Sequence, residues 1–387
     1  MKKILPFIES ETSGKSYKTH KYCFDGIEMP NLIYDDHQDL TFKKYGETEK
    51  LTSTRQLFDK ANEIQKFSKP IFKYFLDGSR RTYKVDDMAY DNRVYPVIAG
   101  QIGVGCCKRD DEGNLKNQLI ELQLVLSLPE NASKDNKKDL FFNNLATKLN
   151  ENEFLKSRNL KFHKILDYED KKLQEGEKYE NLGIAKIQDE MVEQEKKIVA
   201  YLAHKNLLNE DAFLLKDGSL EYKTMKTGDF KDLSIIKSNY KCVVGVSKSF
   251  NPEKCSDKKG QSNAKKIAEL GLYHRTPAYM FESQVSRGKE GTVKFAIWYL
   301  RIRDKRYTSS PFEGIIKVEK ILVSEDEQEN GLDTREIDMI SANLINERNP
   351  VCYGKDNRWA NHLYPVYLTE SFIKSKYLSN EYFINLF

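Results

Sequence analysis

Two short stretches of the sequence place an aspartate directly after an apolar run. Residues 72–83 read FKYFLDGSRRTY and residues 212–222 read AFLLKDGSLEY, so Asp-Gly-Ser occurs at Asp77 and again at Asp217. Asp-Gly between apolar runs is the strongest local signal for a two-residue hairpin turn, because Gly tolerates positive φ. The alternative is that each Asp lies at the end of a buried strand and points into a shared cleft, where a metal ion needs oxygen ligands. The recurrence of the motif favours the second interpretation.

The composition is that of a folded chain rather than a disordered or membrane-spanning one. The 387 residues are 39% apolar and 11% aromatic with a net charge of +4, and no apolar run approaches the length of a membrane span. The apolar part of the first ten residues is too short for a signal peptide. We therefore expect a soluble, cytoplasmic protein. The six cysteines form no CxxC pair and no Cys/His cluster, which argues against a zinc site or a disulfide framework.

The pattern of apolar residues predicts a mixed α/β order of elements. We expect a helix over 54–67, an antiparallel meander of strands over 71–76, 93–109 and 119–128, a long helix over 181–208, strands over 212–217 and 241–249, a hairpin of 293–303 with 313–322, and a helix over 332–345. Residues 129–186 are strongly charged and predict helices and loops inserted on the outside. No glycine-rich phosphate loop of the GxxxxGK[ST] kind occurs, so we do not expect the chain to hydrolyse ATP itself.

This order is that of an RNase H-like fold, a mixed sheet flanked by helices, here with a charged helical insertion and a C-terminal extension of a hairpin and helices. More specifically, the chain resembles the NurA family of nucleases, which work beside HerA-type hexameric ATPases. The resemblance lies in FLDGSRR (75–81), LLKDGSL (214–220), VVGVSKS (243–249), AIWYLRI (296–302) with GIIKVEK (314–320), and HLYPVYLTES (362–371). It implies an N-terminal extension over 1–54 and a NurA-like nuclease domain over 55–387 that carries the insertion at 129–186.

The resemblance implies that the chain cleaves DNA with a pair of divalent ions, Mg²⁺ or Mn²⁺. Such ions stabilise the attacking and leaving oxygens of a phosphodiester and prefer carboxylate ligands. Asp77 would bridge the ions and Asp217 would bind one of them. A glutamate of the long helix would complete the set, and the apolar stripe of that helix favours Glu195, then Glu190. For either glutamate the alternative is a solvated charge on an amphipathic helix.

Further candidates lie on the later motifs, and one expected group is absent. Lys248 would hold the scissile phosphate or orient the attacking water, and Tyr364 would hydrogen-bond a phosphate; a surface lysine and a core tyrosine are the alternatives. NurA-like enzymes carry a histidine downstream of this tyrosine, but LTESFIKS (368–375) contains none. Either His362 takes that role from a different direction, or Glu370 fills it, or it is lost.

Basic residues on two segments are candidates for contacts with the DNA backbone. Arg80 and Arg81 follow the first Asp-Gly-Ser, and Arg301 and Arg303 alternate along the expected late hairpin, which would give an affinity that falls as salt rises. A solvated strand face is the alternative. The resemblance also implies a homodimer and a HerA-like hexameric ATPase as partner, in DNA repair by end processing or in anti-phage defence.

Two other functions stay open. The first is a catalytically inactive RNase H-like module that binds DNA or a partner ATPase, for which the missing histidine would be a sign of decay. The second is an RNase H-like enzyme with another substrate, such as guided cleavage of the Argonaute kind, although little space exists for guide-binding domains before residue 55. The two intact Asp-Gly-Ser motifs favour the nuclease.

Overall fold

The computed structural model describes most of the chain. The described residues are 4–17, 21–23, 41–133, 138–171, 173, 177–220, 235, 237–252, 255, 261–284, 292–308, 310–351 and 359–387. Cys352 and parts of the charged segments at 133–139 and 169–181 lie outside them.

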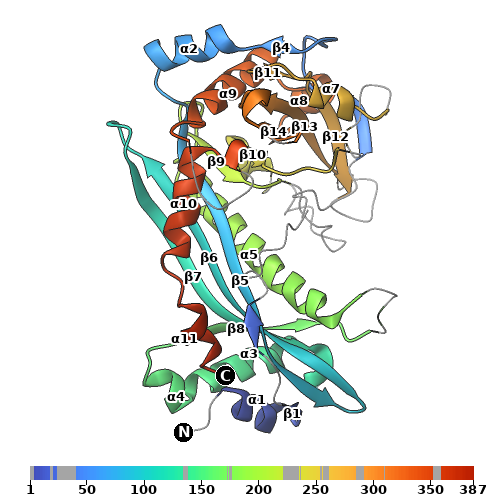
Figure 1. The fold of residues 1–387 in the computed structure, drawn as a ribbon, viewed down its shortest axis with the longest axis vertical. Coiled ribbons are helices and arrows are strands. Elements are labelled where there is room, and N and C mark those ends of the chain that lie inside the picture. Colours follow the sequence, from blue (N-terminus) through green and yellow to red (C-terminus); the bar gives the residue numbers. More distant parts are fainter. Residues whose placement is uncertain are drawn as a thin grey trace.

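The centre of the molecule is a mixed sheet with the strand order of an RNase H-like fold (Figure 1). β5 (Phe72–Tyr90), β6 (Arg93–Arg109) and β7 (Leu115–Pro129) form an antiparallel meander. β9 (Phe213–Asp217) pairs with β5 in parallel, and β10 (Val243–Ser247) pairs with β9 in parallel. The order across this part of the sheet is therefore β7-β6-β5-β9-β10. The predicted fold class, with its meander and its two later parallel strands, is confirmed.

The sheet continues past β10 as an antiparallel series. It consists of β14 (Ile315–Ile321), β13 (Thr292–Arg301), β12 (Tyr279–Gln284) and β3 (Thr41–Tyr45). β13 and β14 are the hairpin that the sequence predicts over 293–303 and 313–322.

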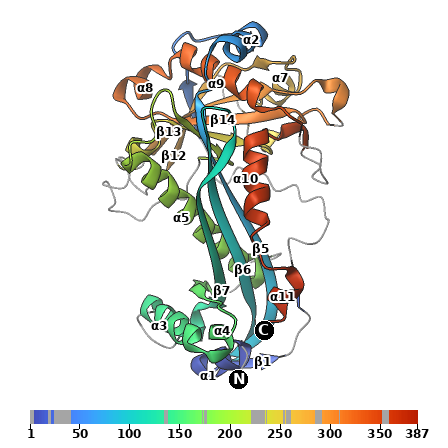
Figure 2. The ribbon, with the colours of Figure 1, turned by 90° about the vertical axis from the view of Figure 1, so that its left-hand side faces the viewer.

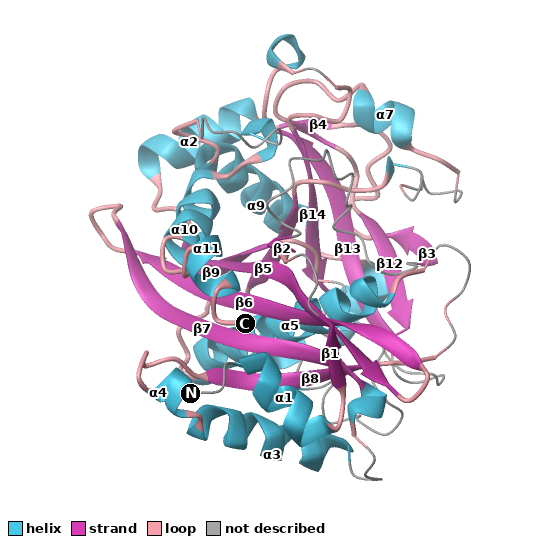
Figure 3. Ribbon diagram, turned by 60° about the horizontal axis from the view of Figure 1, so that its bottom comes forward, coloured by secondary structure: helices cyan, strands magenta, loops and turns pink. Residues whose placement is uncertain are grey.

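The charged segment 129–186 adds a strand that the sequence-based prediction does not include. β8 (Phe162–Tyr168) pairs in parallel with β7 at the other edge of the sheet, and α3 (Lys138–Glu151) and α4 (Glu153–Lys156) lie beside it (Figure 3). Only helices and loops are expected here from the sequence, because the short strand FHKILDY mixes charged with apolar residues. Its apolar side chains Phe162, Ile165 and Tyr168 are buried in one cluster with residues of α3 and α4.

β5 departs most from its predicted length. The sequence predicts a strand over 71–76 that ends before Asp77, but β5 continues through Asp77 to Tyr90, because β6 pairs with it along almost all of its length. The turn between the two strands falls at Asp91 and Asn92, where Asp91 has a φ of +52°. Asp77 therefore lies inside a strand and is neither a hairpin turn nor a strand end, whereas Asp217 is the last residue of β9.

Helices cover both faces of the central strands. α5 (Tyr179–His204) packs on one face and α10 (Tyr364–Lys374) on the other (Figure 2). A Cβ atom at Gly78 would meet side chains of α5, whereas a Cβ atom at Gly105 would meet Ile373 of α10. Successive side chains of a strand point to opposite faces. Asp77, which is adjacent to Gly78 and pairs with Gly105, therefore points toward the α10 face.

The apolar core is divided by the sheet in the same way. Leu76 and Leu214 pack in one cluster with Ile187 and Ile198 of α5. Phe75 and Leu215 pack in a second cluster with residues of α9 (Thr334–Glu347) and of α10. The long helix predicted over 181–208 corresponds to α5, and the helix predicted over 332–345 corresponds to α9.

Within the described residues, the first 56 residues contribute strands to the same sheet. β1 (Lys15–Tyr17) and β2 (Tyr22–Cys23) pair with β5, β3 pairs with β12, and β4 (Arg55–Gln56) pairs with β11 (His274–Arg275). Other α-helices of the described residues are α1 (Ile4–Thr12), α2 (Phe58–Phe67), α7 (Ala264–Ala268), α8 (Glu325–Asn330) and α11 (Asn380–Ile384). Among the described helices, none is both long and apolar enough to cross a membrane.

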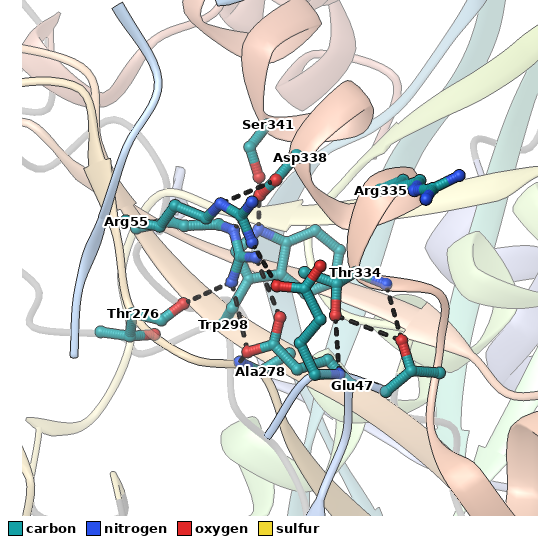
Figure 4. A network of polar contacts seen from close by, with 12 residues as sticks. Glu47, Arg55, Thr276, Ala278, Trp298, Thr334, Arg335, Asp338 and Ser341 are labelled. Atoms are coloured by element: carbon teal, nitrogen blue, oxygen red, sulfur yellow. Dashed lines mark hydrogen bonds and ion pairs between the residues drawn. The ribbon is translucent and has the colours of Figure 1, made fainter. Parts of the chain in front are cut away.

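A buried ion network ties this N-terminal part to α9 (Figure 4). Arg275 has no solvent exposure. Its Nη2 lies 2.9 Å from Oε2 of Glu47, and its Nε lies 2.7 Å from Oδ1 of Asp338. Arg55 adds a second guanidinium 3.0 Å from Asp338, and Glu47 also accepts from the backbone N–H of Ala278. Each buried charge therefore has an opposite charge beside it, which is the condition for burying it at all.

Candidate active site

The strand pairing brings Asp77 and Asp217 side by side. Leu76 is in register with Lys216 on the parallel pair β5 and β9, so the next residues along both strands are the two aspartates. Residues in register on parallel strands share a face, and both carboxylates therefore lie on the α10 face. The adjacency follows from the position of each Asp-Gly-Ser on its strand.

Asp77 is a buried acid without a complete set of partners. Its side chain is almost fully buried, and among the described residues its Oδ2 has no hydrogen-bond partner. Burial raises the pKa of Asp77 well above its usual range, and the carboxylates of Asp217 and Glu370 raise it further. A cation beside this oxygen would favour the charged form and so oppose both causes of the shift.

Lys248 lies directly after β10 and faces this pair. Its Nζ is 2.7 Å from Oδ2 of Asp217. Burial by itself would lower the pKa of Lys248, but Asp217, Glu370 and Asp77 together raise it. The lysine is therefore held as an ammonium among the acids. Asn361 fixes its backbone, because the Asn361 amide donates to the Lys248 carbonyl over 2.6 Å.

Glu370 of α10 is a fourth member of this cluster. Burial would raise the pKa of Glu370, but the charges of Lys248 and Lys374 lower it below its usual value, with a smaller contribution from His362. His362 is buried, and its ring meets Tyr367 edge-on at 5.6 Å between centroids. Of the possibilities for the missing histidine, Glu370 is the side chain that interacts with Asp77 and Lys248. Tyr364 begins α10 half-buried, and no hydrogen bond of its hydroxyl occurs within the described residues.

Glu195 reaches the same strands from the other face of the sheet. Its Oε2 lies 2.9 Å from Nζ of Lys216, and both side chains are buried. Burial raises the pKa of Glu195 despite this partner. Burial would lower the pKa of Lys216, but Glu195, Asp217 and Asp77 raise it. The structure therefore places Glu195 close enough to affect the two aspartates electrostatically, but with the strand backbone between them.

The turn after Asp217 is held by buried side chains on this second face. The ammonium of Lys216 donates to the carbonyl of Asp217 over 2.8 Å. The carboxylate of Glu319 on β14 accepts from the hydroxyl of Ser219 at 2.9 Å and from the backbone N–H of Leu220 at 2.8 Å. These contacts fix the backbone that carries the Asp217 carboxylate. Neither Lys216 nor Glu319 is identified by the sequence, because their role depends on which strands become neighbours.

The glycines of the two Asp-Gly-Ser motifs serve different purposes. A Cβ atom at Gly78 would lie 2.3 Å from Oε1 of Glu195, a distance that real atoms do not reach. At Gly218 the φ is +82°, and the nearest atom to a Cβ there is Nζ of Lys216 at 3.7 Å. Gly78 thus makes room for Glu195, and Gly218 provides the backbone conformation that ends β9.

We expect Gly78→Ala to destabilise the protein by roughly 1–3 kcal/mol, the usual cost of overpacking. The cost should largely vanish in a Glu195→Ala background, because the clashing carboxylate is then gone. Gly218→Ala should cost about 1 kcal/mol in either background, because its strain is in the backbone. Urea unfolding of the single and double variants measures these differences, and an equal cost of Gly78→Ala in both backgrounds would contradict the assignment.

The structure places Glu190 and Arg80 away from the carboxylates. Glu190 lies on α5 but binds Lys164 of β8 at 2.7 Å and Gln194, so it belongs to the helix–sheet packing. Arg80 lies on the α5 face, where its Nε donates to Gln188 over 2.6 Å. Arg81 lies on the Asp77 face with its guanidinium 5.2 Å from the ring centroid of Tyr377. Of the two arginines, only Arg81 therefore shares a face with the acids.

The expected basic ribbon on the late hairpin does not form. Arg301 has no solvent exposure, and its guanidinium donates to the carbonyls of Glu313, Ala268 and Pro311. Arg303 lies beyond the end of β13 and donates to Asn349 and to the carbonyl of Arg348. The assignment of Arg301 to DNA is therefore wrong, because a guanidinium enclosed by carbonyls cannot contact a phosphate.

The side chains on this face are of types that bind divalent cations, but they are not arranged as a metal site. In the part of the chain that the structure describes, no three acidic, His or Cys side chains converge closely enough to hold an ion as they stand. The ammonium of Lys248 lies among the carboxylates instead. Asp217 is paired with Lys248 and Glu370 with Lys374, whereas Oδ2 of Asp77 lacks a partner among the described residues. Hard oxygen ligands of this kind are what Mg²⁺ and Mn²⁺ select.

Comparison with known proteins adds a structural likeness. No family model matches the sequence, and no curated protein matches it. Among solved structures, the NurA nuclease from Sulfolobus solfataricus is similar, with a TM-score of 0.40 and 11% sequence identity over 82% of this chain and 87% of that one. At this level the likeness carries no information about activity, which must be argued from the side chains.

Proposed function

We propose that the chain is a divalent-metal-dependent DNA nuclease that hydrolyses phosphodiester bonds at Asp77, Asp217 and Glu370. The observation that carries the proposal is the buried carboxylate of Asp77, whose Oδ2 has no partner among the described residues and which lies in register beside a second carboxylate. Holding like charges together in a buried place costs folding free energy. A bound cation and a negatively charged substrate would offset that cost, and charged groups with shifted pKa values are concentrated at functional sites.

Asp77 and Asp217 would hold the Mg²⁺ or Mn²⁺, with Glu370 next to them on α10. When bound, the ion would polarise the phosphoryl group and stabilise charge on the leaving oxygen. Lys248 would turn its ammonium from Asp217 to a non-bridging phosphate oxygen while Asn361 keeps its backbone in place. Arg81, on the same strand face as Asp77, would contact a neighbouring phosphate. Glu195 would support the site from behind through Lys216.

The resemblance of the motifs leads us to propose three further features. These are a HerA-like hexameric ATPase as partner, a homodimer as the assembled form, and a role in DNA end processing or anti-phage defence. The second candidate function is a catalytically inactive module that binds DNA or the ATPase. It is favoured by one observation, the ion pair of Lys248 with Asp217 in the place where a metal ligand would have to be free.

The proposal predicts cleavage that depends on divalent ions and on Asp217. Purified protein should cut end-labelled single- or double-stranded DNA in Mn²⁺ or Mg²⁺ and not in EDTA. Asp217→Asn should lower the rate by at least about 10³-fold, because a ligand of the ion is lost. Glu190→Gln is the matched control, since this buried glutamate binds Lys164 instead. Cutting that survives Asp217→Asn would refute the site, and the absence of cutting even with a HerA-like ATPase would favour the inactive module.

A further inference from the structure

A second site lies between α2 and the C-terminal end of α9, apart from the carboxylates. A hollow there has a volume of about 80 Å³, and its lining combines aromatic rings with four side-chain amides and one guanidinium, from Phe58, Asn62, Gln65, Tyr273, Asn346, Arg348 and Asn349. A cavity needs roughly 10–15 Å³ to hold one water molecule. The hollow therefore has room for about one flat ring and not for a whole nucleotide or a lipid chain.

The rings in the hollow form a stack that ends at the surface. Phe58 lies parallel to Tyr273, with 7° between the ring planes and 5.9 Å between the centroids. Arg348 lies on the Tyr273 ring as well, 4.7 Å from its centroid, and donates to its hydroxyl. Phe58 remains 46% exposed. Arg348 thus packs on the Tyr273 ring, and the exposed part of the Phe58 ring is available to a further planar group.

The position of the Tyr273 ring is fixed by its backbone. Tyr273 has a φ of +59°, which is uncommon for a residue other than glycine. Its N–H donates to the carbonyl of Arg301 over 2.9 Å, and its carbonyl accepts from the N–H of Leu57 over 3.0 Å. A side chain held in this conformation by its surroundings is a common feature of binding sites.

The polar side chains around the stack indicate which kind of planar ligand the hollow would bind. Asn62 and Gln65 lie on the same side of α2 as Phe58, and within the described residues neither side chain forms a hydrogen bond. An amide offers a donor and an acceptor together, which matches the edge of a nucleobase. A phosphate is not favoured, because the guanidinium of Arg348 is directed to Tyr273 and to the carbonyl of Ile345.

We propose that this hollow binds a nucleobase, stacked on Phe58 and hydrogen-bonded at its edge by Asn62 and Gln65. The base would belong to a DNA strand whose backbone continues toward the carboxylates, or to a free nucleotide. The site is joined to the start of β5, since Arg109 binds Glu347 at the end of α9 and donates to the carbonyl of Phe72. The inference extends the proposed nuclease function from cleavage to recognition of the strand.

The test measures how tightly the protein binds a single-stranded oligonucleotide that contains 2-aminopurine. The fluorescence of the 2-aminopurine base reports binding. The full chain with Asp77→Asn is used in EDTA, so that binding is measured without cleavage and independently of nuclease activity. Phe58→Leu should weaken binding roughly five- to 150-fold, the loss associated with one stacked base. Phe67→Leu is the matched control, because Phe67 lies on the same helix, is 81% exposed and does not line the hollow.

Two further arms complete the test. The double variant Asn62→Ala/Gln65→Ala alters only exposed or half-buried side chains of α2 and should also weaken binding, which guards against misfolding of Phe58→Leu. An oligonucleotide without a base at the recognised position should bind equally to all variants. Titration with deoxynucleoside monophosphates shows whether a free nucleotide binds the hollow without a DNA strand. Binding that is unchanged in Phe58→Leu, or weakened equally in Phe67→Leu, would overturn the proposal while leaving cleavage unaffected.

Discussion

Asp77→Asn should stabilise the metal-free protein and abolish cleavage at the same time. The carboxylate of Asp77 is buried beside Asp217 and Glu370, and its Oδ2 has no partner in the described residues. An amide removes one of the like charges and can donate to a neighbouring carboxylate. We expect a gain in unfolding free energy of roughly 1–3 kcal/mol in EDTA, the usual cost of a buried acceptor left unpaired. Cleavage in Mn²⁺ should fall by at least about 10³-fold.

The gain in stability should depend on pH in a defined direction. Because the pKa of Asp77 is raised in the folded state, its proton stabilises the fold below the pKa of an unfolded aspartate, about 3.9. That contribution is lost as the pH rises through the folded-state pKa. The difference between Asp77→Asn and the wild type should therefore be larger at pH 8 than at pH 4, in urea unfolding with EDTA. Glu190→Gln, which removes a carboxylate paired with Lys164, should lose stability instead. A loss of stability in Asp77→Asn at pH 8 would contradict this electrostatic account.

Arg275→Met should produce the largest loss of stability among single substitutions. The side chain is fully buried between Glu47 and Asp338, and its removal leaves one carboxylate without any cation and the other with Arg55 alone. Breaking a buried ion pair from one side costs roughly 3–5 kcal/mol. Because Glu47 belongs to the N-terminal part and Asp338 to α9, the loss should be accompanied by detachment of β3 and β4 from the sheet.

Urea unfolding measures the loss, and hydrogen exchange in residues 41–56 measures the detachment. Arg306→Met is the matched control, because Arg306 pairs with Asp304 at 2.9 Å on the surface, where an ion pair contributes about 0–1 kcal/mol. A cost for Arg275→Met as small as that for Arg306→Met would show that the network does not hold the N-terminal part in place.

Much of the fold can be predicted from local pattern. The apolar stripe of α5 and the dense apolar runs of β6, β9 and β10 give both the type and the order of the elements. The meander and the two parallel strands then predict that Asp77 and Asp217 lie on neighbouring strands, and the observed register of β5 with β9 places them side by side. The length of β5 cannot be predicted in this way, because the polar residues after Asp77 are held in the strand by pairing with β6 and not by their own preference.

The rest of the site depends on which side of the sheet each residue faces. Glu195 and the aspartates lie on opposite faces of the sheet, because successive side chains of a strand point to opposite faces. Gly78 and Lys216 face α5, whereas Asp77 faces α10. The sequence identifies Glu370 only as one possible substitute for the missing histidine, because nothing else distinguishes it from a solvated helix residue. Arg301 has the sequence context of a strand-face arginine, but it is enclosed by two carbonyls of the connection between β13 and β14 and by one at the end of α7.

Binding of Mn²⁺ to the DNA-free protein tests the central claim most directly. A titration at pH 8, followed by the electron paramagnetic resonance of the free ion, would compare the wild type with Asp77→Asn and with Glu190→Gln. We predict saturable binding by the wild type and by Glu190→Gln, and binding at least about tenfold weaker by Asp77→Asn. Equal binding by all three proteins, or no binding by the wild type, would contradict the assignment of the carboxylates on the α10 face as a metal site.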